Sequence, residues 1–269
     1  MIFKQPLLKL HWFMASQLGF DPRRLVRSLG ALPRYARDWL QFRRGHAGRM
    51  ALAPCLSDRN EEGGATKSEY FWQDLLVARW IHAARPERHV DVGSRVDGFV
   101  AHVASFREIE VFDVRAITSS VPGVVFRQAD LMDPHALGAD IGAGYCDSLS
   151  CLHAIEHFGL GRYGDPIDPR GYQRGIANLA RLLRAGGTFY LSTPLGRERV
   201  EFNANWVFDP RTIIACAAAQ QLTLVRLTAI SASTAPRVLS PTDAELDALA
   251  AAPYTLGVFE FKKRDREIG

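Results

Sequence analysis

The segment from His153 to His157, with the sequence HAIEH, gathers the side chains best suited to acid–base chemistry. An imidazole titrates near neutral pH and can take a proton from a substrate hydroxyl. On a helix, His153 and His157 would lie one turn apart on one face, a spacing that also occurs in zinc hydrolases. A zinc peptidase is disfavoured, because Glu156 and both histidines follow an apolar strand and lead directly into the glycine-rich sequence FGLGRYGDP.

The polar loop after this segment supplies further candidates. Tyr163, Asp165 and Asp168 fall within a stretch of about a dozen residues that is rich in glycine and proline. An aromatic ring and two carboxylates can stack on a sugar and accept hydrogen bonds from it, and they would also suit many other ligands. We predict that these three residues contact the substrate.

A second group of candidates follows a predicted strand at 88–93. Asp91 lies near the end of that strand, and the sequence GSRVDG places Ser94 between Gly93 and Gly98. Glycines let the backbone approach a ligand, and the first N–H groups of the helix that follows favour negative charge. Two glycines five residues apart are a weak signal for a nucleotide site by themselves.

Two further acids strengthen that signal. Asp113 ends the next predicted strand 20 residues after Gly93, where a carboxylate can accept hydrogen bonds from both ribose hydroxyls. Asp130 ends the third strand, where it can accept from the amino group of an adenine. Two acids and no arginine disfavour a ribose that carries a 2′-phosphate. Either Asp could instead cap a helix or hold a turn.

The elements that must position these residues alternate between strand and helix. A helix opened by a capping box at Thr66–Glu69 comes first, and a later helix begins at Asp209-Pro210. The predicted strands cover 88–93, 109–114, 124–131, 145–152, 188–194, 222–231 and 255–263, and the other helices cover 99–106 and 172–184, the latter stopped by Gly186-Gly187. This order predicts a parallel, doubly wound sheet with helices on both faces, whose last two strands could pair antiparallel.

The amino-terminal region differs from the rest in charge. Residues 1–50 hold ten Lys and Arg against two acids, a net charge of +8; the whole chain carries +4, so the remainder is −4. An apolar stripe that includes Leu25 and Leu29 predicts a basic amphipathic helical arm over 1–50, interrupted at Pro33. A linker over 45–65 then leads into a domain over 51–269. The arm would dock on an anionic membrane or an acidic partner, or else pack on its own domain.

Length and composition bound the remaining classes. At 269 residues the chain can form one α/β domain with an appendage, and no segment is long and apolar enough to span a bilayer or resembles a signal peptide. The four cysteines show no CxxC spacing, which disfavours a disulfide framework or zinc ribbon and favours the cytoplasm, either free or at the inner membrane face. The net acidic main domain disfavours a nucleic-acid partner.

Several long segments resemble a known family. These segments are HVDVGSRVDGFVAHVASFREIEVFDVR, QADLMD, DSLSCLHAIEHFGLGRYGDPIDPRGY and GGTFYLSTPLGRERVEFNANWVF. They are similar to a bacterial family of proteins like S-adenosylmethionine (SAM)-dependent methyltransferases, of formally undefined function and associated with surface polysaccharide synthesis. The resemblance covers about 54–263 and is most specific over 145–172.

The resemblance implies a fold and a cofactor. The wider class I methyltransferase superfamily has a Rossmann-like sheet of seven mostly parallel strands, the last of them antiparallel. It also implies contacts to SAM at Asp91, Gly93, Asp113, Asp130 and Leu131. The loop GSRVDG departs from the denser GxGxG of most such enzymes, which leaves open the path of the loop around the methionine moiety. By position, Tyr70, Gln73 and Asp74 could close over that moiety.

Three interpretations of the HAIEH segment stay open. Glu156-His157 resembles the EH of many class I methyltransferases, where one residue binds the acceptor or acts as general base. His153, Glu156 and His157 could instead hold a divalent metal, as in metal-dependent 2′-O-methyltransferases of small RNAs, with Glu201, Asn203 or Asn205 as a further ligand; we expect His in relatives where this chain has Asn205. The third interpretation is a structural helix cap.

Three functions are therefore compared. The first is SAM-dependent O-methylation of a sugar hydroxyl on a surface glycan or its precursor, in which the choice of substrate rests on the family association. The second is an NAD-dependent oxidoreductase or epimerase, which the sequence GSRVDG disfavours because dinucleotide binders use GxGxxG. The third is a catalytically degenerate methyltransferase fold that scaffolds glycan-assembly proteins.

Overall fold

The computed structural model describes residues 11, 13–64, 66–138, 140–231 and 234–265. The chain divides into two compact units, Met1–Ala65 and Thr66–Gly269. Each unit has its own secondary structure, so each is described by itself.

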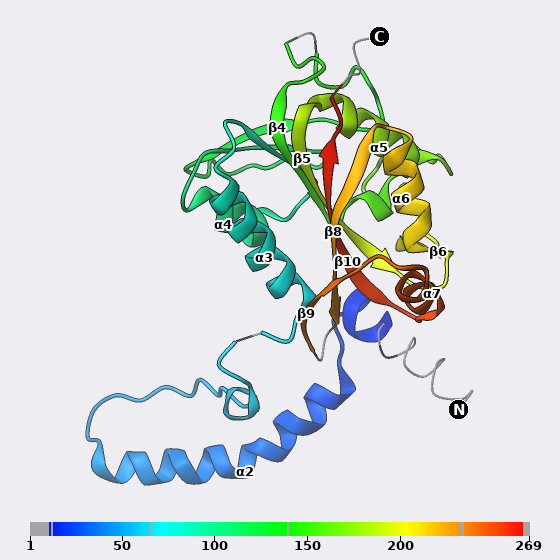
Figure 1. Ribbon diagram of the computed structural model, residues 1–269. Coiled ribbons are helices and arrows are strands. Elements are labelled where there is room, and N and C mark those ends of the chain that lie inside the picture. The colour runs from blue at the N-terminus through cyan, green and yellow to red at the C-terminus, as the bar shows by residue number, and fades with distance from the viewer. Residues whose placement is uncertain (1–10, 12, 65, 139, 232–233, 266–269) are drawn as a thin grey trace. The chain divides into compact units, whose positions relative to one another are not determined.

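The first unit is built on the long helix α2, Pro22–Gly45. The Asp21 carboxylate caps the helix by accepting hydrogen bonds from the backbone N–H groups of Arg23 and Arg24, and Pro22 occupies the first turn, where its missing N–H costs nothing. The predicted interruption at Pro33 is wrong: Pro33 lies inside one continuous helix, which curves along its length (Figure 1). None of the helices in the described part of the chain is long and apolar enough to cross a membrane.

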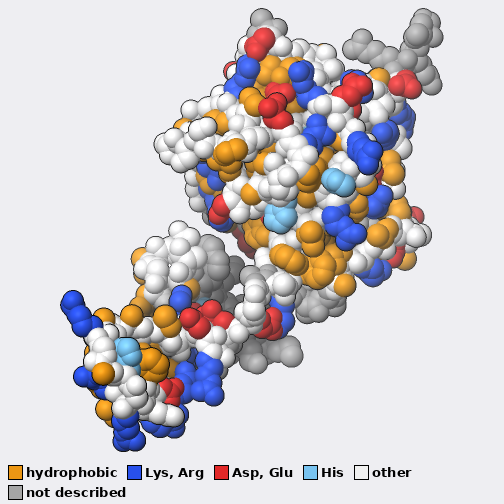
Figure 2. All heavy atoms as spheres, turned by 90° about the vertical axis from the view of Figure 1, so that its left-hand side faces the viewer, with side chains coloured by type: hydrophobic (Ala, Val, Ile, Leu, Met, Phe, Trp, Pro, Cys, Tyr) orange, Lys and Arg blue, Asp and Glu red, His pale blue; other side chains and the backbone are white. Residues whose placement is uncertain are grey.

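Side chains of both kinds cover α2. Leu25, Val26, Leu29 and Leu32 are exposed large apolar residues, and Ala31 is the one described residue of the helix that is buried. On the face that Figure 2 presents, Lys and Arg side chains lie around the border of this unit, with hydrophobic side chains between them.

The second unit is built on an eight-stranded sheet in the order β3-β2-β1-β4-β5-β10-β8-β9. The strands are β1 (His89–Val92), β2 (Ile109–Asp113), β3 (Val124–Gln128), β4 (Cys146–Leu152), β5 (Leu183–Leu195), β8 (Leu222–Ser231), β9 (Thr234–Leu239) and β10 (Thr255–Lys263). Strands β1 to β5 pair in parallel, whereas β10 lies between β5 and β8 and is antiparallel to both. The predicted class I methyltransferase sheet is therefore confirmed, with β9 added as an eighth, antiparallel edge strand.

Helices cover both faces of this sheet (Figure 1). One face carries α3 (Glu69–Ala84), η2 (Val96–Val100) and α4 (Ala101–Ala104), and the other carries α5 (Gly171–Leu182), α6 (Pro210–Ala218) and α7 (Asp243–Ala251). Each face has its own core of buried apolar side chains, with Ile81 and Val103 in one and Leu179 and Ile213 in the other. Burial on both faces fits a central strand such as β4, in which six of the seven residues are buried although the strand includes Ser148 and Ser150.

Local signals set some boundaries and not others. Asp209 caps α6 as predicted, since its carboxylate accepts from the N–H of Arg211. The predicted capping box is wrong: α3 begins after Ser68, which makes no side-chain cap. The predicted stop at Gly186-Gly187 is also wrong, because α5 ends at Leu182 and both glycines lie within β5. A hairpin of β6 (Arg199–Glu201) and β7 (Asn205–Val207) was not predicted.

Candidate functional site

The carboxyl end of β1 is organised by Asp91. Its fully buried carboxylate accepts hydrogen bonds from the N–H and the hydroxyl of Ser94 at 3.0 and 2.8 Å, and from the hydroxyl of Ser150 on β4 at 2.5 Å. Burial raises the pKa of Asp91 to about 7, against the effect of these donors. Asp91 therefore holds the loop after β1 in place and has no surface left for a ligand.

The glycines of that loop are required by close contacts. Gly93 has φ of +76°, and a Cβ there would lie 2.7 Å from the Cβ of Ala154. A Cβ on Gly98 would lie 2.9 Å from a carboxylate oxygen of Asp74 on α3. Gly93 thus brings the loop against the end of β4, and Gly98 lets α3 approach the loop.

Asp113 ends β2, the strand that neighbours β1. Its carboxylate forms a two-pronged ion pair with Arg115, at 2.9 Å from Nε and 2.6 Å from Nη2, and the N–H of Arg115 also donates to it. Nη2 of Arg115 reaches the carbonyl oxygen of Gly93 at 3.3 Å. The arginine therefore lies across the gap between the ends of β1 and β2, where we predicted the ribose.

Asp130 and Leu131 lie just beyond β3, which ends at Gln128. The Asp130 carboxylate accepts from the N–H of Met132 at 2.9 Å and so holds a turn. Leu131 is buried in the core below it. The N–H of Ala129 donates to the carbonyl oxygen of Asp113, which places Asp130 next to the end of β2. The structure thus brings the ends of β1, β2 and β3 together with their acids.

A buried charge cluster follows β4. His153 Nδ1 lies 2.5 Å from Oε1 of Glu156, which is fully buried, and His153 Nε2 lies 3.6 Å from Oε1 of Glu69 at the start of α3. Burial would lower the pKa of His153, but the two carboxylates raise it to about 9. The pKa of Glu156 is lowered: burial opposes this, and the charge of His153 outweighs it. His153 is therefore a cation at neutral pH, held between two carboxylates.

The surroundings of this cluster fix it firmly. The ring of Tyr70 stacks on His153 with 4.6 Å between centroids, and the hydroxyl of Tyr254 donates to Glu69 at 2.5 Å. His153 has φ of +52°, a left-handed conformation uncommon for residues other than glycine, and its N–H donates to Ser192. Backbone strain of this kind persists where the surrounding contacts hold it.

His157 is placed differently. Its Nδ1 lies 2.7 Å from the carbonyl oxygen of Ala204, and since a carbonyl can only accept, Nδ1 carries the hydrogen. Nε2 is then the basic nitrogen of the neutral ring. Burial lowers the pKa of His157, although the carboxylate of Glu156, 3.9 Å from Nε2, opposes this. A neutral imidazole with a free lone pair is what a general base requires.

The predicted substrate loop, 158–172, is held by its own acids. Asp165 accepts hydrogen bonds from the N–H groups of Gly159, Gly161 and Tyr163 at 3.0 to 3.2 Å. Asp168 accepts from the N–H of Arg170 and pairs with Arg174 on α5 at 2.9 Å. Both carboxylates thus shape the loop, and Tyr163 is the predicted loop residue whose ring meets the site, edge-on to His157 at 5.6 Å.

A chain of hydrogen bonds joins α3 to β5. Gln73 donates to Asp74 at 3.0 Å and accepts from the hydroxyl of Ser192, whose oxygen accepts from the N–H of His153. Burial raises the pKa of Asp74, and Gln73 opposes this. Tyr70, Gln73 and Asp74 therefore border the site from α3, on the side where we placed the methionine moiety.

The described residues do not support a metal site at His153, Glu156 and His157. Among the described residues, no three His, Cys, Asp or Glu side chains are grouped so that they could hold a metal ion. The amide nitrogen of Asn205 donates to the carbonyl oxygen of Trp206, and Asn205 lies in the β7 strand of the hairpin. Ile155–His157 form a 3₁₀ turn, η3, and His153 lies before it, so the segment is not the α-helix on which the zinc spacing depends.

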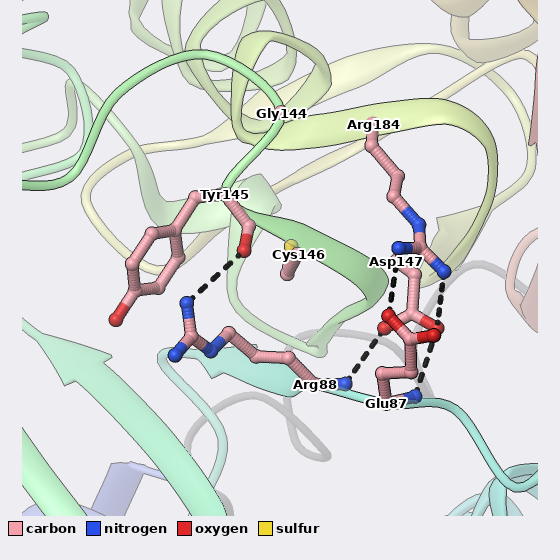
Figure 3. Close-up of a pocket in the computed structure, with 7 residues that line it drawn as sticks. All are labelled: Glu87, Arg88, Gly144, Tyr145, Cys146, Asp147 and Arg184. Atoms are coloured by element: carbon pink, nitrogen blue, oxygen red, sulfur yellow. Dashed lines mark hydrogen bonds and ion pairs between the residues drawn. The ribbon is translucent and has the colours of Figure 1, made fainter.

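A hollow lies at the opposite edge of the sheet, where β1 and β4 begin (Figure 3). Asp147 accepts from the N–H groups of Glu87 and Arg88, and Arg184 pairs with Glu87 and Asp147 at 2.8 and 3.3 Å. Three of the charged side chains that line this hollow thus pair with one another, and the fourth, Arg88, pairs with Glu110.

Sequence reasoning missed four residues of the site. Glu69 lies 84 positions before His153 in the chain, so no local pattern links them. Ser150 and Ser192 look like ordinary strand residues, and their roles depend on which strands are neighbours. Arg115 follows directly after Asp113 and Val114, and its charge two residues from a predicted ribose acid was the one available signal.

Comparisons with known proteins give one partial family match. Residues 142–216 match the model of DUF268, described as a Caenorhabditis protein of unknown function. This segment contains the HAIEH motif and the loop after it. No curated protein matches the sequence.

Solved structures with a similar chain path include proteins named as methyltransferases. The 1,6-didemethyltoxoflavin-N1-methyltransferase of Burkholderia thailandensis has 14% identity and a TM-score of 0.49, over 81% of this chain and 94% of that one. The YcgJ protein of Bacillus subtilis has 13% identity and a TM-score of 0.48, and the match covers 72% of this chain and 98% of that one. A sarcosine dimethylglycine methyltransferase assigned in Galdieria sulphuraria has 11% identity and a TM-score of 0.48, and the match covers 71% of this chain and 86% of that one. At these values the likeness says nothing about activity.

Proposed function

We propose that this chain is a SAM-dependent methyltransferase that transfers the methyl group to a hydroxyl. The observation that carries the proposal is the meeting of Asp113, Gly93 and Asp130 at the carboxyl edge of the sheet, where open α/β sheets bind ligands. The cramped approach of Gly93 to Ala154 supports a loop shaped to lie close to a ligand. When bound, SAM supplies an electrophilic methyl group.

The chain's own residues would then hold and activate the acceptor. Asp113 is suited to accept from ribose hydroxyls once Arg115 yields part of its carboxylate, and Asp130 is suited to the adenine edge. His157 takes the proton of the acceptor hydroxyl at Nε2 while Ala204 keeps Nδ1 protonated. Glu156 and His153 hold the turn that carries His157, and Glu156 stabilises the imidazolium that forms.

The finer assignment is a sugar hydroxyl on a surface glycan or its precursor. Tyr163 supports it, because an aromatic ring beside the proposed base can stack on a sugar face. Tyr70 of α3 and Tyr163 of the 158–172 loop contact the two histidines, so residues outside the cofactor site can contribute to specificity.

Calorimetry with SAM and with NADH tests the proposal. We expect heat for SAM and none for NADH, and Asp113→Ala should weaken SAM binding by about 1.5–3 kcal/mol through lost charge-assisted hydrogen bonds. Asp147→Ala, at the opposite edge, is the matched control and should leave SAM affinity unchanged. Folded protein that binds no SAM would contradict the proposal and favour a scaffolding role.

For the amino-terminal unit we propose attachment to an anionic membrane surface. The exposed apolar residues Leu25, Val26 and Leu29 share α2 with several arginines, the combination that binds headgroups and acyl chains together. Co-sedimentation should show binding to vesicles with phosphatidylserine and little to neutral vesicles. Leu25→Glu/Leu29→Glu should abolish it, and equal binding by this variant would contradict the proposal.

A further inference from the structure

The guanidinium of Arg162 stands beside the proposed base with most of its donors free. Nη1 donates to the carbonyl oxygen of Ala204 at 2.9 Å and lies 3.3 Å from Nδ1 of His157. Within the described residues, Arg162 forms no ion pair with an Asp or Glu. Since a guanidinium has five N–H donors, Nε and Nη2 remain available to an incoming group.

The ring of Tyr163 connects this arginine to the cofactor side. The guanidinium of Arg162 lies 5.2 Å from the ring centroid and that of Arg115 lies 4.6 Å from it. Both side chains are partly exposed to solvent, and Asp113 neutralises only Arg115. Two guanidinium groups thus lie near this ring, and that of Arg162 forms no ion pair with a carboxylate of the described residues.

The loop that carries Arg162 is held in a fixed shape. Asp165 accepts from three backbone N–H groups around it, and Gly161, on one side of Arg162, has φ of +69°. A cation on a fixed loop loses little conformational freedom on binding a ligand, which favours recognition of a planar or tetrahedral oxyanion by a guanidinium fork.

We infer that Arg162, on the face of Tyr163, binds a carboxylate or phosphate group of the methyl acceptor and so selects acidic acceptors. This inference rests on the proposed function, since it names the substrate class of the same site. Methyl transfer to such an acceptor forms the O–CH₃ bond, breaks the S–CH₃ bond and moves the hydroxyl proton to His157. The anion next to His157 would also favour the imidazolium that results.

The test uses the full chain with inorganic phosphate and acetate as probes, and follows the imidazole signals of His157 by NMR. We expect a saturable shift with one or both anions. A response to phosphate alone indicates a phosphorylated acceptor, and a response to acetate indicates a carboxylate. Arg162→Gln should weaken the apparent affinity about tenfold or more, as expected for lost charge-assisted hydrogen bonds.

Two variants separate recognition from charge alone. Arg162→Lys keeps the positive charge but not the forked pair of N–H donors, so its apparent affinity for the anion should lie between those of Arg162→Gln and the wild type. Arg170→Gln removes an exposed arginine near the end of the same loop and should titrate like wild type. No saturable shift in wild type, or an unchanged titration of Arg162→Gln, would overturn the inference. This assay needs neither SAM nor turnover, so its result is independent of the calorimetry. If the protein bound no SAM, the proposed methyl donor would be wrong, but the anion site at Arg162 would still be tested by the titration.

Discussion

The two edges of the central sheet use similar residues in opposite ways. At the amino edge, Asp147 accepts from two backbone N–H groups and Arg184 pairs with two acids. At the carboxyl edge, Glu156 and His153 are buried, and each has one side-chain atom, Oε2 and Nε2, that forms no hydrogen bond with the described residues.

This difference supports our proposal that the functional site lies at the carboxyl edge. At the amino edge, burial would raise the pKa of Asp147, but the backbone N–H donors of Arg88 and Glu87 lower it. The carboxyl edge buries Asp91 and His153 with pKa values of about 7 and 9. Perturbed groups of this kind concentrate in active sites, where reactivity is favoured over stability.

The buried ion pair of the carboxyl edge depends on Glu156. Glu156→Gln leaves the cationic His153 with one carboxylate in a buried setting, so we expect a loss of about 3–5 kcal/mol in the free energy of unfolding at pH 7. Urea denaturation measures it. A loss below about 1 kcal/mol would show that the buried pair contributes no more than a surface ion pair.

The stability of the fold should also depend on pH through His153. The pKa of His153 is about 9 in the fold and 6.5 in its ordinary state, so its contribution, on the order of 3 kcal/mol, is fully present below pH 6.5 and is lost as the pH rises through 9. Unfolding free energies at pH 6.5 and 9 should therefore differ. His153→Asn, which tolerates the left-handed backbone, should remove this difference, and an equal slope in both proteins would contradict the assignment.

The sequence predicted the sheet well because its signals are local. Val, Ile and Phe residues marked β1 and β2, and Asp209 marked the start of α6. It failed on β9, which contains Pro236, a residue tolerated only because β9 lies at the edge of the sheet. Which strands are neighbours is a property of the whole chain, so the edge could not be recognised from the segment.

The site was predictable only in part for the same reason. Asp113 and His157 were found from their place after strands, and both face the site. Asp165 was expected to meet substrate, yet its carboxylate is occupied by its own loop, because a turn rich in glycine has N–H groups that need an acceptor. The partner of His153 at Glu69 depends on the packing of α3, which no spacing in the sequence encodes.

Arg115 offers a smaller test of the carboxyl edge. If its ion pair with Asp113 competes with the ribose, Arg115→Ala should strengthen SAM binding severalfold, an effect of about 1 kcal/mol, because the carboxylate then has both oxygens free. Calorimetry measures it, with Arg237→Ala as control, since Arg237 pairs with Glu245 and lies on β9, the edge strand farthest from β3. Weaker SAM binding in Arg115→Ala would mean that the arginine assists the cofactor.

The smallest effect is expected at the amino edge. Arg184 is about half exposed, at 48%, and its partner Glu87 is more so, at 78%, so water competes with their ion pair. We expect Arg184→Ala to cost less than about 1 kcal/mol in urea denaturation and to leave SAM affinity unchanged. A larger loss of stability would mean that Arg184 does more than hold Glu87 and Asp147. A change in SAM affinity would mean that the two edges are coupled through β1 and β4, and the separation of roles between them would then fail.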